Sequence, residues 1–237
     1  MTLKFTRLIS FALVCLMISS ACSPLYRSSI AHVPVMKQAG DFQGGMGLET
    51  GSTYINAHYA FTDYMYVSAS GTFWATDNSN HAGGEAGVSF YQSDESNCLS
   101  IGLLGGYGNT NVFNSNWGNP TIWDPTFSQL MNGQYSKFSL QPAYSFFSDR
   151  ADVTFSFRNT FLYWTQISDG TGDSPGLEYF FEPAVSVRAG SSYVKPFFDF
   201  GLQIPIYRSF DHFVVPFHVG LGMDVNLSLI KKKKEEQ

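Results

Sequence analysis

Apolar and polar residues alternate through most of the chain from Asp41 onward. Around residues 151–165, for example, Val153, Phe155 and Phe157 fall on one face, while Thr154 and Arg158 fall on the other. A period of two residues predicts β-strands with two chemically different faces, and no stretch shows a useful helical period. The pattern therefore predicts an all-β fold of about ten strands, near 41–49, 53–61, 64–75, 83–92, 97–107, 135–147, 151–165, 177–188, 193–204 and 213–229.

The predicted connections alternate in length along the chain. Short turns are expected at 62–63, 93–97, 148–150 and 189–192, and longer connections at 75–82, 108–134, 166–176 and 205–212. Outer-membrane barrels have short periplasmic turns and longer extracellular loops. We therefore expect an antiparallel up-and-down β-barrel, and ten strands would place both chain ends in the periplasm. The pattern alone does not separate ten strands from eight.

The predicted apolar face carries aromatic residues near the strand ends. They are Phe61, Phe90 and Phe146 beside the short turns, and Phe73, Tyr107, Tyr163, Tyr179 and Phe213 beside the long ones. Two such rows are typical of a membrane barrel. Against a closed barrel stand Pro142, Pro183, Pro196 and Pro216, which fall within predicted strands and would need bulges because a barrel has no free edge.

Alternation does not say which face is inside. With the apolar face outward the chain is a membrane barrel; with that face inward it is a soluble, lipid-tethered barrel that binds a small apolar ligand. Charged residues make up only 14% of the chain, against about a quarter in typical globular proteins, and aromatic residues make up 16%. This composition fits a protein with one lipid-facing and one polar surface, as does the arrangement of aromatic rows.

The N-terminus has the order of an export signal. Lys4 and Arg7 precede an apolar stretch at 8–18, followed by Ser19-Ser20-Ala21 and Cys22. The ending is similar to the lipobox of bacterial lipoproteins, although Ser19 stands where many carry Leu. We therefore expect a signal peptide at 1–21, a tether lipidated on Cys22 at 22–40, the barrel at 41–230 and a charged tail at 231–237. Ordinary cleavage that leaves Cys22 as a thiol is the alternative, and Cys98 has no other cysteine partner once Cys22 carries lipid.

Two short segments carry a family resemblance. Tyr26, followed by Val33-Pro34-Val35-Met36-Lys37-Gln38-Ala39-Gly40-Asp41, resembles the lead-in of small lipid-anchored outer-membrane β-barrel-like proteins of Bacteroidetes-type bacteria, and residues 57–63 resemble their second strand and turn. The motifs cover about a seventh of the chain. That family has no established activity, so the resemblance implies fold and outer-membrane location but no chemistry. Because no acidic residue follows Cys22 closely, anchoring with the N-terminus on the periplasmic side is expected.

The polar face holds the candidate site residues. We expect a structural network in the lumen made by Arg158, Glu182, Arg188, Lys195, Asp199, His218 and Asp224. Buried charges must pair or be hydrated, and Arg158 with Glu182 on neighbouring strands is the expected pair. A small pore is a further alternative.

Nothing in the sequence specifies a reaction. His81 and Asp211-His212 fall in predicted outer loops without a catalytic motif, so a hydrolase ranks last and no enzyme activity is expected. No cofactor, metal or nucleotide site is expected either.

The tryptophans of the 108–134 loop, Trp117 and Trp123, suggest a site that recognises glycan or lipopolysaccharide. Removal of residues 1–21 leaves 12 basic against 19 acidic side chains, which disfavours nucleic acid. The oligomeric state is not indicated.

Overall fold

The fold consists of antiparallel strands throughout. The computed structural model describes residue 26 and residues 32–76, 79–115, 128–168, 175–209 and 216–227, of which 76, 113–115 and 128–131 are described by their backbone alone. The strands are β1 (Phe42–Glu49), β2 (Ser52–Thr62), β3 (Met65–Thr76), β4 (Ser79–Ser93), β5 (Asn97–Ser115), β6 (Ser128–Phe147), β7 (Ala151–Ser168), β8 (Gly176–Ala189), β9 (Val194–Leu202), β10 (Ile204–Tyr207) and β11 (Phe217–Asn226).

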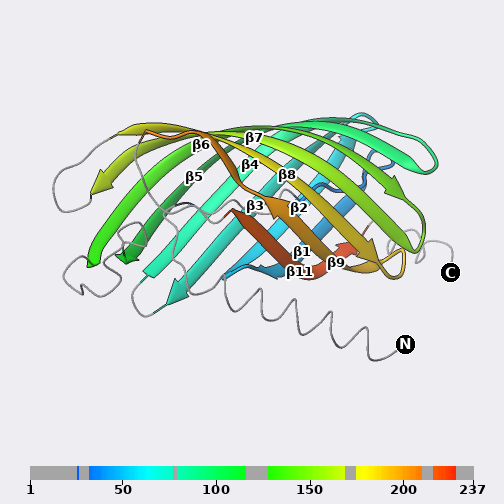
Figure 1. Cartoon of the computed structure of the whole chain (residues 1–237). Coiled ribbons are helices and arrows are strands. Elements are labelled where there is room, and N and C mark those ends of the chain that lie inside the picture. Colours follow the sequence, from blue (N-terminus) through cyan, green and yellow to red (C-terminus); the bar gives the residue numbers. More distant parts are fainter. Residues whose placement is uncertain are drawn as a thin grey trace, which may run out of the picture.

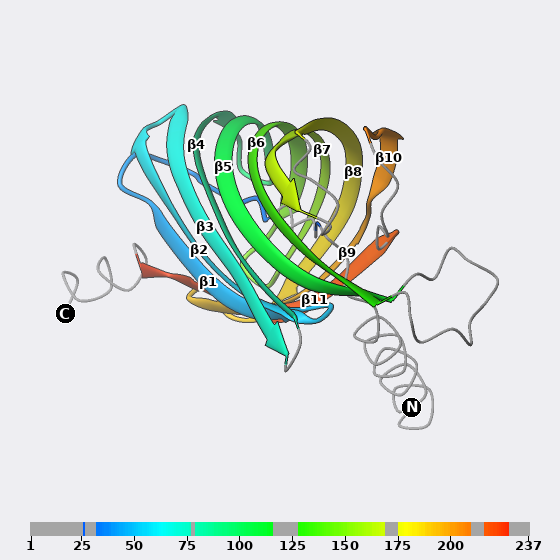
Figure 2. The same cartoon turned by 90° about the vertical axis from the view of Figure 1, so that its left-hand side faces the viewer.

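The strands close into a barrel (Figures 1 and 2). Strands β1 to β8 pair consecutively, β9 pairs with both β8 and β11, and β11 pairs with β1. Strand β10 follows β9 after Gln203 and pairs with the N-terminal half of β8. The predicted all-β, antiparallel barrel is confirmed, with ten strands in the wall and β10 as a short addition.

The predicted boundaries hold best where alternation is clean. Strands β2, β7 and β8 begin and end within about three residues of their predicted ranges, whereas β5 and β6 reach much farther, to Ser115 and Ser128. The expected long connection at 75–82 is wrong, because β3 and β4 stay paired up to Thr76 and Ser79. His81 therefore lies in β4 on the inner face, where it is buried, rather than in an outer loop.

The connections still differ between the two ends of the barrel. At one end, here called the turn end, the links are residues 63–64, 94–96, 148–150 and 190–193. At the other end, called the loop end, residues 50–51 and 77–78 are equally short, but 116–127, 169–175 and 208–216 are the longest links. Strands β5 and β6 extend farthest in the same direction.

The strand prolines need no bulges. Pairing continues in constant register through Pro142 with β5, Pro183 with β7 and Pro196 with β11. The ladder between β6 and β7 omits the pairs at Gln141 and Pro142 but resumes in the same register at Ala143. Pro216 precedes β11, and its carbonyl accepts a hydrogen bond from the Gln203 amide at 2.9 Å. The expected bulges at these four prolines are therefore absent.

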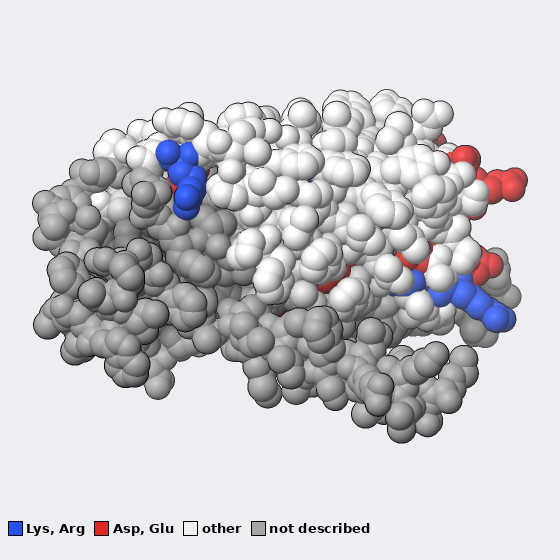
Figure 3. Space-filling model, viewed as in Figure 1, with Lys and Arg blue, Asp and Glu red and all other residues white. Residues whose placement is uncertain are grey.

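The polar face is the inner one. On β7, Arg158 is 1% exposed, whereas its neighbour Phe157 is 47% exposed. Phe155, Phe198 and Phe200 also face outward. Every Asp, Glu, Lys, Arg and His of the described strands points into the lumen, as the burial pattern shows. On the face shown in Figure 3, a broad band of uncharged side chains covers the wall, and most charged side chains gather toward the two ends.

The outer face of the wall carries a continuous apolar band. On β5 the outward apolar run extends from Leu99 to Tyr107, which at about 3.3 Å per residue and a tilt of about 45° crosses roughly 20 Å. Phe61, Phe90 and Phe146 border this band near the turn end, and Phe73, Tyr107 and Tyr163 near the loop end; all six are exposed. Beyond the loop-end row the outward side chains become amides, at Asn80, Asn109, Asn132, Gln134 and Gln166.

Helices contribute almost nothing to the described part of the chain. Among those residues there is no helix whose length and apolar character would let it cross a membrane.

Candidate functional site

The lumen contains the segment that precedes the first strand. Residues 32–41, here called the lumen segment, enter the barrel interior (blue before β1 in Figure 2). His32, Val33 and Met36 are at most 9% exposed. The sequence predicted a tether and lead-in at 22–40, and the structure places its residues 32–40 within the lumen.

At the turn end the segment is held by apolar and backbone contacts. Met36 packs in a buried cluster with Ala60, Tyr66, Tyr91, Cys98 and Phe147. The Lys37 ammonium lies 4.6 Å from the centre of the Phe147 ring, a cation–π contact. One Asp41 carboxylate oxygen accepts hydrogen bonds from the backbone amides of Lys37 at 2.9 Å and Gln38 at 3.2 Å. Lys37 and Asp41 of the lead-in motif therefore hold the lumen segment in place.

In the middle of the lumen a group of charged and polar side chains, here called the tether cluster, binds the lumen segment. The Asp224 carboxylate on β11 forms an ion pair with Arg188 on β8, whose Nε lies 2.9 Å away, and accepts a hydrogen bond from Gln43 Nε2 on β1 at 3.0 Å. His32 Nε2 lies 3.1 Å from the same carboxylate. Arg188 also donates to the carbonyl oxygen of Val33. The tether cluster therefore joins three strands to the segment that they enclose.

Glycine makes room for this arrangement. A Cβ atom at Gly45 would lie 2.2 Å from an Asp224 carboxylate oxygen and close to the Asn56 amide. Because Gly45 of β1 has no Cβ atom, the Asp224 carboxylate of β11 has room to lie directly against β1.

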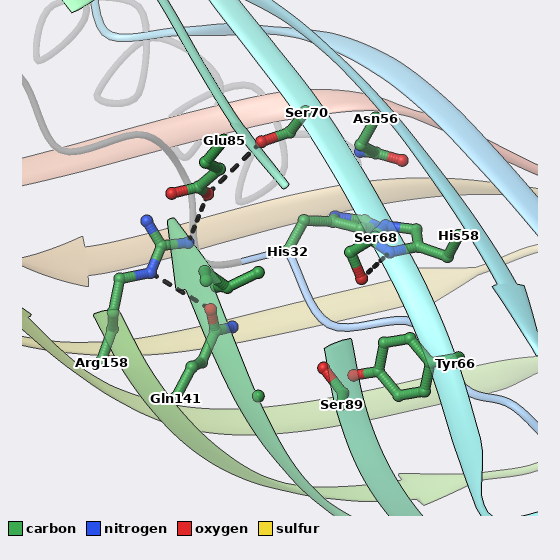
Figure 4. A pocket seen from close by; sticks show the side chains of 12 residues that line it. His32, Asn56, His58, Tyr66, Ser68, Ser70, Glu85, Ser89, Gln141 and Arg158 are labelled. Atoms are coloured by element: carbon green, nitrogen blue, oxygen red, sulfur yellow. Dashed lines mark hydrogen bonds and ion pairs between the residues drawn. The ribbon is translucent and has the colours of Figure 1, made fainter. Parts of the chain in front are cut away.

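A second group, the wall cluster, joins strands of the wall to one another (Figure 4). Glu85 on β4 accepts from Lys137 Nζ on β6 at 2.8 Å and lies 3.4 Å from an Arg158 nitrogen on β7. Arg158 Nε donates to Gln141 Oε1 at 3.2 Å, and the Ser70 hydroxyl donates to Glu85 at 3.3 Å. The charged side chains of this cluster are at most 6% exposed, so each depends on its partners for compensation of lost hydration.

Arg158 and Glu182, the expected pair, are opposite each other in the register of β7 and β8. Arg158 also forms an ion pair with Glu85, three strands away. Glu182 accepts a hydrogen bond from the Thr160 hydroxyl at 2.8 Å.

The other predicted network residues also lie inside but do not form one network. Lys195 on β9 pairs with Asp152 on β7 at 2.7 Å near the turn end. Asp199 on β9 and His218 on β11 are 1% and 5% exposed. The His218 ring fills the space above Gly201, where a Cβ would lie 2.2 Å from Nε2.

The loop half of the lumen is apolar and surrounds Tyr26. The Tyr26 side chain is fully buried, and its ring lies 5.4 Å from Tyr135 and 5.3 Å from Phe180. The cluster is completed by Trp74, Val112, Leu162, Trp164 and Ile167 and is here called the aromatic collar. The indole of Trp164 also donates to Glu178 at 3.0 Å.

Little free space remains in the described lumen. A cavity of about 30 Å³ lies between the two charge clusters, lined by His32, His58, Glu85 and Arg158 among others. That volume suits one or two water molecules. A wider vestibule of about 400 Å³ opens at the turn end, beside Lys37, Asp152 and Lys195. Within the described residues, the arrangement pairs charges and fills most of the lumen.

Several predicted features lie outside the described residues: Cys22, Trp117, Trp123 and Asp211-His212. Within the described ranges, no three His, Cys, Asp or Glu side chains gather as metal ligands would. The sequence missed Tyr26 and His32 as lumen residues, because the segment that carries them has no strand periodicity, and it did not single out Gln43 of β1. The family motif of Tyr26 and Val33 was the one available signal.

Comparisons with known proteins give distant fold likenesses. No family model matches the chain, and no curated protein matches it. The N-terminal β-barrel domain of Pseudomonas aeruginosa OprF aligns with a TM-score of 0.32 at 8% identity, over 80% of this chain and 98% of that one. A KdgM porin in complex with disordered oligogalacturonate aligns with a TM-score of 0.35 at 11% identity, over 78% and 98%. The barrel fold described above rests on the strand pairing itself, and membership of the Bacteroidetes-type family stays a prediction.

Proposed function

We propose that the protein is a non-catalytic, lipid-anchored outer-membrane β-barrel with a structural or interaction role. The observation that carries the proposal is the sorting of side chains across the wall. All Asp, Glu, Lys, Arg and His side chains of the described strands point inward, while the outer band is apolar and bordered by aromatic rows. Hydrocarbon favours this sorting, because an outward charge at the bilayer centre is costly.

The same observation weakens the alternatives. A soluble barrel for a small apolar ligand would need the phenylalanine face inside, yet Phe155, Phe157, Phe198 and Phe200 are outside. A pore would need a continuous lumen, whereas the mid-lumen cavity is about 30 Å³. Of the two rim candidates for an outer-membrane hydrolase, His81 is buried in β4 and stacks on Tyr135, and Asp211-His212 lies outside the described residues.

The proposed partners are outer-membrane lipid and, through the outer loops, lipopolysaccharide or glycan. In support, amide side chains at the loop end line a vestibule of about 430 Å³, among them Asn80, Asn109 and Asn132. Amides offer both donors and acceptors for sugar hydroxyls. The acidic balance of the chain supports no nucleic acid partner.

The membrane proposal is tested by extraction. The Cys22→Ala variant is expected to remain in the membrane pellet after carbonate or urea washing and to show heat-modifiable migration on gels, because the wall itself holds the bilayer. Release of Cys22→Ala by carbonate would contradict an integral barrel. Metabolic labelling with a fatty acid that is lost in Cys22→Ala tests the lipid separately.

A matched pair of substitutions tests where the bilayer lies. Phe157→Arg, in the middle of the outer band, is expected to destabilise the barrel in lipid by about 2–4 kcal/mol, while Asn132→Arg, in the amide region, costs about 0–1 kcal/mol. Urea unfolding in vesicles measures both. Equal effects would argue against a membrane boundary between these positions, and conductance steps in a planar bilayer would favour a pore.

A further inference from the structure

The chain before β1 has described points at both ends of the lumen. Tyr26 lies in the aromatic collar in the loop half of the barrel, whose members include Trp74, Val112 and Trp164 close to the loop-end limits of their strands. Met36 lies in the cluster at the turn end with Tyr66, Tyr91, Cys98 and Phe147. Between these points, His32 and Val33 are bound by the tether cluster at mid-lumen. Ten residues of extended chain span up to about 35 Å, which suffices for this crossing.

The chain therefore runs from the loop end toward the turn end before it enters β1. Strand β1 starts at the turn end, where Phe42 is opposite Tyr59 near the 63–64 turn. An anchor at the start of the mature chain would thus be separated from β1 by the length of the lumen.

Chain length limits how far Cys22 can lie from Tyr26. Four residues reach about 14 Å at most, so Cys22 lies within that distance of the Tyr26 backbone. Tyr26 packs on Tyr135, which is opposite Gly108 and Trp164 in the strand register. Those two residues adjoin Tyr107 and Tyr163 of the loop-end aromatic row. Cys22 is therefore within reach of the membrane boundary at the loop end, and the turn-end boundary is beyond its reach.

We propose that the N-terminal segment threads the lumen, so that a lipid on Cys22 is displayed at the loop end and enters the outer leaflet of the membrane. The inference rests on the proposed function, namely a membrane barrel with a lipidated Cys22. It also uses the rule that the longer connections face outside. It replaces the expectation, drawn from the strand count and from the lack of acidic residues just after Cys22, that the anchor lies on the periplasmic side.

Cysteine labelling of intact cells tests this topology. In a Cys98→Ala background, Ser23→Cys reports on the N-terminal side of Tyr26 and Glu235→Cys reports on the tail that follows β11 at the turn end. A membrane-impermeant maleimide is expected to label Ser23→Cys in intact cells and Glu235→Cys only after the outer membrane is opened. A third variant, Ser168→Cys, at the loop-end limit of β7, reports on the orientation of the barrel and is expected to be labelled in intact cells.

Each other outcome overturns the proposal in a recognisable way. Protection of both Ser23→Cys and Glu235→Cys, with labelling of Ser168→Cys, would mean that the chain leaves the barrel on the turn side. Labelling of Glu235→Cys alone in intact cells would mean that the barrel is inverted. If carbonate releases the protein, the membrane proposal itself has failed, and this is measured on the same samples before labelling.

Photo-crosslinking tests the threading without reference to the membrane. A benzophenone amino acid at position 26 keeps an aromatic ring in the collar and is expected to crosslink to peptides of β6 and β8, which carry Tyr135 and Phe180. The same amino acid at Tyr59, on the outer face, serves as the control and should give no such crosslink. Absence of the position-26 crosslink in a protein that is folded by its heat-modifiable migration would overturn the threaded path.

Discussion

The two charge clusters of the lumen differ in what they hold together. The wall cluster joins β4, β6 and β7 through Glu85, Lys137 and Arg158, all of which belong to the barrel wall. The tether cluster places Asp224 and Arg188 against His32 and Val33, which belong to the enclosed segment. Both are deeply buried, and both bring strands together that are not adjacent in the wall.

This difference separates two contributions to stability: ion pairs within the wall, and ion pairs that hold the enclosed segment in the lumen. A buried ion pair is weak evidence of net stabilisation, but removal of one partner is costly because the other charge remains buried. Damage to the wall cluster should therefore lower the stability of the barrel with the segment still in place. Damage to the tether cluster should release the segment as well.

The largest effect is expected for Glu85→Ala. The variant leaves Lys137 and Arg158 without the carboxylate between them, and we expect a loss of about 4 kcal/mol in the free energy of unfolding. Urea titration of the refolded barrel in vesicles measures it. Lys137→Met in the same background should recover part of the loss, and hydrogen exchange at residues 32–38 should stay slow. Fast exchange at residues 32–38 in Glu85→Ala would mean that damage to the wall cluster also releases the lumen segment.

Asp224→Ala should have the next largest effect, about 3 kcal/mol, because Arg188 loses its charged acceptor and His32 and Gln43 lose hydrogen-bond partners. Here hydrogen exchange at residues 32–38 is expected to become faster than global unfolding allows. Gly45→Ala offers a second route to the same end, since its Cβ would collide with the Asp224 carboxylate while leaving all charges present. Unchanged protection in both variants would rule out the tether cluster as the anchor of the segment.

Lys195→Ala sharpens the comparison by supplying a reference pair outside both clusters. Lys195 and Asp152 are 2.7 Å apart near the turn end, and the lysine side chain is 15% exposed. Because water reaches this pair more readily, we expect a loss of about 1 kcal/mol, near the upper limit for partly exposed pairs. If Lys195→Ala lowered the free energy of unfolding as much as Glu85→Ala does, the burial of an ion pair in the lumen would not explain its contribution to stability.

The smallest effect is expected at Asp94 in the turn between β4 and β5. Its carboxylate accepts hydrogen bonds from the backbone amides of Ser96 at 2.8 Å and Asn97 at 2.7 Å, which lower its pKa. Because the pKa is lower in the folded state, the stabilisation is present above the ordinary aspartate range and is lost as the pH falls through the lowered pKa. The pH dependence of unfolding for Asp94→Asn, subtracted from that of the native chain, should show a small loss confined to acid. A difference that grows toward alkaline pH would contradict this assignment.

The sequence predicted the wall better than it predicted the contents of the lumen. Alternation in β7 and β8 is a local property of neighbouring residues, so Phe157 and Arg158 were assigned to opposite faces correctly. Which of these faces was inside depended on the whole barrel. The contact of Arg158 with Glu85 spans three strands, and periodicity specifies only adjacent partners such as Glu182. Residues 32–41 have no period at all, because their contacts are with several strands rather than with one ladder.

The pairing of β1 with β11 has a consequence for the order of assembly. These strands are the first and last of the wall, and their seven pairs, from Gln43 with Asn226 to Glu49 with Gly220, complete the ring. If Cys22 carries acyl chains beyond the loop end, the segment cannot be drawn through a finished ring, because the lipid would have to cross a charged lumen. The wall must then curl around a segment already in place, and Gln43 and Asp224, which meet across this seam, would close over His32 in the final step.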